Sequence, residues 1–161
     1  MDEPVVVERA EQPYVGIPAV VTMAAISSTL PPLLPRVFGW LGARGIVPAG
    51  PPFWRYVVVD MAGELTVEVG VPVADAVSVA EGEPVTAGVL PGGKYVTVTH
   101  VGDPSGLMAA TGELLAWADR AGLAWDVTGQ RWGCRLEEYL TDPAEQPDPA
   151  RWATRLAFKL G

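Results

Sequence analysis

Residues 135–143 read Arg-Leu-Glu-Glu-Tyr-Leu-Thr-Asp-Pro and alternate in polarity as a β-strand does. Successive strand side chains point to opposite faces of a sheet, so Arg135, Glu137 and Tyr139 share one face. The opposite row, extended upstream, is apolar and comprises Trp132, Cys134, Leu136 and Leu140. We therefore predict a strand over residues 131–140 whose apolar row joins the core and whose other row lines a site.

Glu137 has two interpretations at this point. A single glutamate on a strand is most often solvated, because charged side chains are rarely buried without a partner. Beside Tyr139, however, it offers a ligand a negative charge next to an aromatic ring, which suits a cation or a hydrogen-bonding group. An ion pair with Arg135 on the same face would neutralise that charge. The strand pattern alone leaves these alternatives open.

Length and composition indicate one globular domain over residues 1–161, since 49% of the residues are hydrophobic. The chain has no uncharged apolar run of about 18 residues and no basic segment before an apolar one, so we expect no membrane span, no signal peptide and a cytoplasmic location. Cys134 is predicted to be a small buried hydrophobe. One cysteine and one histidine are too few for a zinc site, and we expect no metal or cofactor.

The net charge is −8, from 11 Lys and Arg against 19 Asp and Glu, without a basic cluster. Nucleic-acid affinity comes largely from Lys and Arg neutralising phosphates, so direct nucleic-acid binding is disfavoured. An acidic balance mainly serves solubility, but it attracts cations. The expected partner is a hydrophobic or cationic small molecule.

The first half of the chain predicts strands on either side of one helix. Strands are expected at 5–9, 14–24, 54–60 and 64–73, the last two joined by a turn at 60–63. Between the strands at 14–24 and 54–60, apolar residues at helical spacing define one buried helix face: Leu30, Leu33, Leu34, Val37, Phe38 and Leu41. Gly45 suits the residue just past the helix end. Pro35 must lie in the first turn, or the helix begins later than Leu30.

The second half repeats this order. Strands are expected at 85–90, 94–101, 131–140 and 151–160, with a turn at Pro91-Gly92-Gly93. Asp103 and Pro104 are typical of a helix start, and Gly122 of its end. The predicted buried face of this helix comprises Leu107, Thr111, Leu114, Leu115 and Ala118.

Sequence matches about 80 residues apart indicate a duplication, with halves of about 1–80 and 81–161. Tyr14 matches Tyr95, Trp40 matches Trp117, and the helix end at 41–45 matches 118–122. We predict an α+β fold of two strand-helix-strand-strand motifs related by a pseudo-two-fold axis in one antiparallel sheet. Both helices are expected on one face and a concave ligand groove on the other, where repeated units meet.

Several motifs resemble the GyrI-like small-molecule-binding superfamily, which includes effector-binding domains of bacterial transcription activators. The resemblance covers nearly the whole chain and is carried by residues 90–95, 98–102, 113–117 and 136–143, with a weaker match at 68–73. It implies the same duplicated fold. Without a helix-turn-helix segment in the sequence, a stand-alone ligand-binding member is expected rather than a complete activator.

The resemblance also implies a site. In this family an acidic residue two positions before the tyrosine of the penultimate strand reaches a central groove, and Glu137 matches it. Drug-binding members hold hydrophobic cations there against aromatic side chains. Our candidates for the groove are Tyr139, Tyr56 and Trp54, followed by Phe53, Tyr95, Tyr14 and Phe158, with Glu68 as a second acid. Trp132 ranks lower because strand alternation places it in the apolar row with Cys134 and Leu136. His100 is a minor candidate for a catalytic base, and its alternative is a purely structural role at the end of a strand.

Three functions follow from these residues and the resemblance. The first is binding of hydrophobic, often cationic, multi-ring compounds, anchored by Glu137. The second is hydrolysis of reactive cyclopropane-containing natural products, as the resemblance implies for some members, with Glu137 and Tyr56 or Tyr139 as catalytic groups. A protein-interaction role such as modulating DNA gyrase ranks last, because the acidic charge is dispersed rather than clustered.

Overall fold

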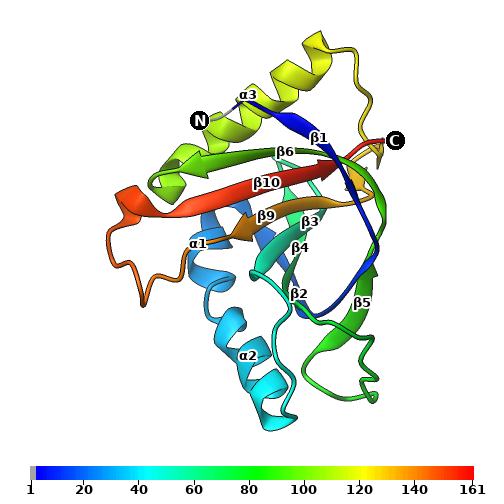
Figure 1. The fold of residues 1–161 in the computed structure, drawn as a ribbon, viewed down its shortest axis with the longest axis vertical. Coiled ribbons are helices and arrows are strands. Elements are labelled where there is room, and N and C mark those ends of the chain that lie inside the picture. Colours follow the sequence, from blue (N-terminus) through cyan, green and yellow to red (C-terminus); the bar gives the residue numbers. More distant parts are fainter. Residues whose placement is uncertain (1–2) are drawn as a thin grey trace.

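The computed structural model describes residues 3–161 and is built on one antiparallel sheet that curls along its length (Figure 1). Its strands are β1 (Val5–Arg9), β2 (Gln12–Thr22), β3 (Phe53–Val58), β4 (Glu64–Pro72), β5 (Thr86–Leu90), β6 (Gly93–Val101), β7 (Val127–Thr128), β8 (Arg131–Trp132), β9 (Arg135–Tyr139) and β10 (Ala153–Lys159). The helices are α1 (Ile26–Thr29), α2 (Leu33–Ala43) and α3 (Leu107–Arg120). Short 3-10 turns occur at η1 (Met23–Ala25), η2 (Pro104–Gly106) and η3 (Pro149–Arg151). The predicted α+β class is confirmed.

The strand order shows the predicted duplication. Along the sheet it runs β1-β6-β10-β9-β3-β4-β2-β5, so the halves meet where β3 pairs with β9. Moving outward, β4 and β10 come next, then β2 and β6. The edge strands are exchanged, because β1 pairs with β6 of the second half and β5 with β2 of the first.

The strand registers match the two halves residue by residue. Tyr14 on β2 and Tyr95 on β6 take equivalent places beside β4 and β10, as the repeat predicts. Followed inward through β3 and β9, the same register matches Trp54 with Glu137. These two residues also stand directly opposite each other across the β3–β9 pair. The pseudo-two-fold axis therefore passes between them.

Both longer helices end as the sequence predicts. Gly45 and Gly122 follow α2 and α3 with φ of 67° and 72°, a left-handed conformation that glycine adopts without steric cost. Helix α2 begins at Leu33, which leaves Pro35 in its first turn. Phe38 corrects the predicted buried face, because α2 turns Val37, Trp40 and Leu41 towards the sheet and leaves Phe38 38% exposed.

The two long helices pack on the same face of the sheet, at its two ends. Helix α2 covers β2 and β4 through a cluster that includes Val15, Val37 and Val71, and α3 covers β6 and β10 through Val96 and Leu114. In Figure 1 they lie at opposite ends of the molecule. The middle of this face, over β3 and β9, is left open between them.

This arrangement corrects the predicted position of the groove. We expected it on the face without helices, but that inner face is filled by a core cluster comprising Tyr14, Phe53, Leu90, Tyr95, Cys134, Leu136 and Ala157. Cys134 is fully buried there, as expected. The larger cavity lies on the helix-bearing face instead, because each helix covers only its own half of the sheet.

The predicted strand at 131–140 is two strands, interrupted at Gly133 and Cys134. The interruption shifts the alternation, so Trp132 does not share a row with Leu136 as expected. It lies with Arg135 and Phe158 on the helix-bearing face. Leu140 falls beyond the end of β9 and is 39% exposed, which removes it from the predicted apolar row.

Gly70 provides a test of packing inside the curl. It stands opposite Phe53, and a Cβ atom there would lie 2.5 Å from the Phe53 ring. We expect Gly70→Ala to lower the free energy of unfolding by about 1–3 kcal/mol, because the ring has to shift within a filled core. As the matched control, Gly39→Ala in α2 places its Cβ in open space and should raise stability by up to about 1 kcal/mol. Urea denaturation measures both, and a neutral Gly70→Ala variant would contradict the packing described.

Candidate functional site

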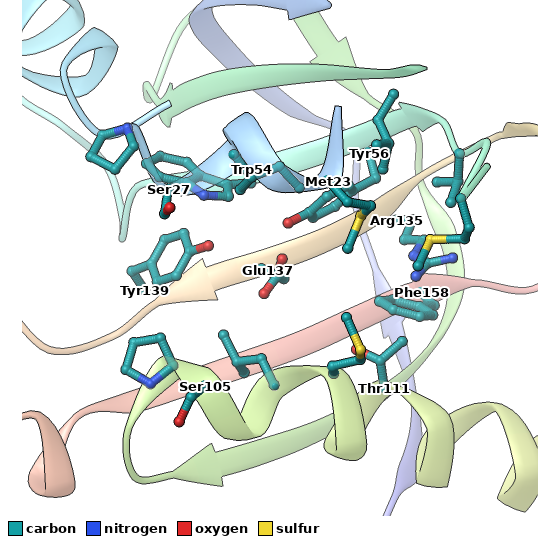
Figure 2. A pocket seen from close by; sticks show the side chains of 18 residues that line it. Met23, Ser27, Trp54, Tyr56, Ser105, Thr111, Arg135, Glu137, Tyr139 and Phe158 are labelled. Carbon is teal, nitrogen blue, oxygen red and sulfur yellow. The ribbon is translucent and has the colours of Figure 1, made fainter. Parts of the chain in front are cut away.

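A cavity of about 560 Å³ lies over the middle of the sheet, between the two helical regions (Figure 2). Its floor is formed by side chains of β3, β9 and β10. One wall comes from η1 and α1 in the first half, and the other from η2 and α3 in the second. Because equivalent elements of both halves enclose it, the cavity straddles the pseudo-two-fold axis.

Glu137 lies in the floor of this cavity and is only 8% exposed. Its β9 parity directs it to the helix-bearing face, with Trp54 as its neighbour on β3. Burial raises the pKa of the Glu137 carboxyl above its ordinary value, while a hydrogen bond with Tyr56 and the charge of Arg135 partly oppose that rise. The cavity therefore contains a desolvated carboxyl group.

The adjacent glutamate has the opposite environment. Glu138 points to the inner face, where Arg9 donates two hydrogen bonds of 2.9 and 3.1 Å and Arg155 donates one of 2.8 Å. Burial alone would raise its pKa, but the hydrogen bonds and charges of these arginines outweigh burial and lower it. Of two neighbouring carboxylates that each line a cavity, Glu138 is neutralised by two arginines and Glu137 has no ion-pair partner within residues 3–161.

Aromatic side chains surround Glu137. Trp54 and Tyr139 meet edge to face, with ring centroids 4.7 Å apart. The Tyr56 hydroxyl points towards the carboxylate of Glu137 (Figure 2). Burial and the nearby carboxylate raise the pKa of both tyrosines, so both stay neutral hydroxyls that can donate hydrogen bonds.

Arg135 does not form the ion pair with Glu137 that could have neutralised the site. Within residues 3–161, no oxygen of Glu137 lies within 4.0 Å of its guanidinium nitrogens. The guanidinium carbon instead lies 4.7 Å from the ring centroid of Phe158, 4.8 Å from that of Trp132 and 5.8 Å from that of Tyr56. Burial among these rings lowers the pKa of Arg135.

The structure brings five of the predicted site residues together around this cavity: Glu137, Tyr139, Tyr56, Trp54 and Phe158. It places Tyr14, Phe53, Tyr95 and Glu68 on the opposite face, which corrects the expectation of one groove for all nine. Phe53 directly precedes Trp54 in β3, and adjacent strand residues face opposite ways.

The four remaining residues have partners of their own on the inner face. Tyr14 donates a hydrogen bond to Glu68, with oxygen distances of 2.8 and 2.9 Å, and Arg55 lies 3.5 Å from the same carboxylate. Phe53 and Tyr95 line a second cavity of about 320 Å³.

Sequence reasoning missed the side chains that enclose the cavity from the helical regions. They are Met23, Ile26, Ser27 and Pro31 in the first half and Pro104, Ser105, Leu107, Met108 and Thr111 in the second. Only Leu107 and Thr111 were expected to face inward, as core. His100 lies outside the cavity lining, with its ring nitrogen 3.2 Å from the Asp103 carbonyl oxygen at the start of η2.

The GyrI-like small molecule binding domain matches residues 2–160 of the sequence. The chain belongs to this family. No curated protein matches the sequence.

Solved structures share this GyrI-like fold. EcmrR in a cryo-EM complex with DNA has a TM-score of 0.75 and 21% identity, over 98% of this chain and 57% of EcmrR. SAV2435 bound to tetraphenylphosphonium has a TM-score of 0.68 and 11% identity, over 99% and 94% of the two chains. A hydrolase from Listeria innocua has a TM-score of 0.68 and 15% identity, over 99% and 92%. At these identities the similarity shows the fold alone.

Within residues 3–161, no helix has both the length and the apolarity needed to cross a membrane. The same residues bring together no group of three His, Cys, Asp or Glu side chains that could hold a metal ion.

The two adjacent glutamates make opposite predictions for stability. Glu137→Gln should stabilise the ligand-free protein by on the order of 1 kcal/mol at pH 7, because a neutral amide avoids the cost of burying an unpaired charge. The folded-state pKa of Glu137 is raised, so its proton stabilises the fold below the unfolded pKa of about 4.3, and this contribution is lost as pH rises through the folded value. The gain should therefore disappear near pH 4.

Glu138→Gln is the matched comparison and should destabilise by about 1–3 kcal/mol at pH 7, since Arg9 and Arg155 lose the negative charge and one of the two acceptor oxygens of the carboxylate. The folded-state pKa of Glu138 is lowered, so its contribution is present above about 4.3 and is lost as pH falls through the folded value. Urea denaturation at pH 7 and pH 4 measures both effects. Shifts of the same sign at pH 7 would contradict the assignment of the two environments.

Proposed function

We propose that this chain binds hydrophobic, often cationic, multi-ring small molecules in the cavity, with Glu137 as the acidic anchor. The observation that carries the proposal is a carboxyl group that is buried in an aromatic floor and has no ion-pair partner among residues 3–161. Trp54, Tyr56 and Tyr139 are the proposed aromatic contacts, with Phe158 at the end where Arg135 lies.

The physical chemistry of this floor favours a cation. Withdrawing a carboxylate from water costs several kcal/mol unless a positive charge accompanies it. A bound lipophilic cation supplies that charge and displaces water at the same time. Each well-placed aromatic face adds about 1–2 kcal/mol of cation–π attraction in a desolvated site.

The walls of the cavity suit ligands of varied shape. Of the four methionines in the chain, three line it: Met23, Met61 and Met108. Methionine is unbranched, flexible and polarisable, so it adapts its packing to different apolar surfaces. Met61 and Met108 are 59% and 66% exposed, which leaves them free to close over a ligand.

The fold comparison gives independent support. SAV2435 shares the fold and is bound to tetraphenylphosphonium, a hydrophobic cation with four aromatic rings. That ligand combines the positive charge and the apolar surface that we propose for ligands of the cavity around Glu137.

Hydrolysis of a strained electrophile is the second candidate, because Tyr56 and Glu137 interact directly in the cavity. A hydrolase from Listeria innocua shares the fold. In cyclopropane hydrolysis, a water oxygen bonds to one ring carbon and gives up a proton to a base, the ring C–C bond breaks, and its electron pair takes up a proton at the other carbon. Glu137, with its raised pKa, suits the proton transfers, and the neutral Tyr56 hydroxyl suits orienting the reacting groups.

Binding is tested by calorimetric titration with tetraphenylphosphonium. The wild-type protein should bind it saturably, and Glu137→Gln should weaken binding at least about tenfold, or about 1.4 kcal/mol. Affinity should increase with pH above about 4.3 as the carboxyl ionises at its raised pKa. The control is Glu64→Gln, an exposed glutamate on β4 outside the cavity. Equal affinity of wild type and Glu137→Gln would refute the anchor role.

Turnover is tested with a strained cyclopropane-containing electrophile and mass spectrometry. An enzyme should give a product heavier by one water, and Glu137→Gln and Tyr56→Phe should each abolish most of the rate because proton transfer or orientation is lost. Glu64→Gln should retain activity. Stoichiometric binding without product would exclude the hydrolase.

A further inference from the structure

Arg135 lies in the cavity lining but has no role in the anchor described above. Together with Glu137 it supplies the charged side chains that line the cavity among residues 3–161. Its pKa responds to burial and to the charges of Tyr56 and Glu137, with no hydrogen bond contributing. A guanidinium carries five N–H donors, and those of Arg135 have no partner within the described residues.

The surrounding rings hold this guanidinium in place. Phe158, Trp132 and Tyr56 contact it at centroid distances of 4.7, 4.8 and 5.8 Å, and Trp132 and Phe158 also pack edge to face at 5.7 Å. These cation–π contacts give the guanidinium N–H groups no oxygen acceptor. Figure 2 shows Arg135 at one end of the cavity, with Glu137 nearer its centre.

We propose that Arg135 forms a cationic pole of the cavity that binds an anionic group of the ligand, so that the preferred ligands are amphoteric aromatic compounds. A basic or permanently cationic centre lies at Glu137, and a carboxylate lies at Arg135. This inference rests on the proposed binding function and specifies its ligand class.

Charge balance favours such a ligand. A simple lipophilic cation compensates Glu137, but it is repelled by Arg135 and leaves that half-buried charge without an anionic partner. A carboxylate on the same molecule accepts charge-assisted hydrogen bonds from the guanidinium, and two parallel N–H donors match its two oxygens. Arg135 and Glu137 are two residues apart on β9, so their Cα atoms are about 7 Å apart, and the two ligand charges need a comparable separation.

A matched pair of probes tests the proposal: (4-carboxybutyl)triphenylphosphonium and its methyl ester. Both carry the same hydrophobic cation, and only the first carries a carboxylate at the end of a short chain. Calorimetric titration of the wild-type protein should show the acid binding at least about fivefold more tightly than the ester. Arg135→Met should remove this preference by weakening binding of the acid, while the ester binds as tightly as before or more tightly.

Arg131→Met is the control, because Arg131 is an exposed arginine of β8 outside the cavity lining, and it should keep the preference. Arg135→Lys keeps the charge without the planar pair of donors and should give an intermediate preference. Equal wild-type affinities for acid and ester would overturn the proposal even if Arg135→Met failed to fold. Tight, Glu137-dependent binding of the ester in that case would leave the proposed function standing. If neither probe binds, both proposals fall together.

Discussion

The antiparallel pairing of β3 with β9 is the contact on which the rest of the molecule depends. It joins the two halves into one sheet, sets Trp54 opposite Glu137, and places the pseudo-two-fold axis between them. Each helix then covers only its own half, since α2 packs on β2 and β4 while α3 packs on β6 and β10. The cavity lies on the part of this face between the two helices, with the first turns of α3 in one of its walls.

Among residues 3–161, alternation along the central strands places paired charged side chains on the inner face of the sheet and unpaired ones on the cavity face. On the inner face, Arg55 pairs with Glu68 in the first half, and at the equivalent positions Glu138 pairs with Arg155 in the second. The duplication thus keeps a cross-strand ion pair while reversing its polarity. On the other face, Glu137 stands at the position equivalent to Trp54, and it has no ion pair in the part of the chain that the structure describes. These charges inside the curl are paired with one another, whereas Glu137 and Arg135 in the cavity take part in no ion pair within the described residues.

The cavity is nearly symmetric, and the pair Trp54 and Glu137 breaks this symmetry and determines where its charge lies. Tyr56 and Tyr139 occupy equivalent positions, and the walls from η1 and α1 resemble those from η2 and α3 in position. The match of Trp54 with Glu137 breaks this symmetry, and Arg135 among its three rings adds a second charge at one end. A nearly symmetric apolar cavity therefore carries a negative charge near its centre and a positive charge at one end. This charge distribution is the basis of both proposals for its ligand.

By itself, the sequence predicted most of the strands, the ends of the two long helices and the duplication, because alternation, helical spacing and helix-ending glycines are local signals that act over a few residues. It also singled out Glu137 over Glu138, through strand parity and family resemblance. Only the tertiary structure decided which face holds the cavity, since that depends on where each helix packs on the sheet. Trp132 lies on the other face because residues 133 and 134 leave the regular strand conformation, so the alternation of β9 does not extend back to it. The methionines of the walls carry no periodic signal. Whether Arg135 pairs with Glu137 was also decided there, because aromatic rings from β3, β8 and β10 surround its guanidinium only once the strands are paired.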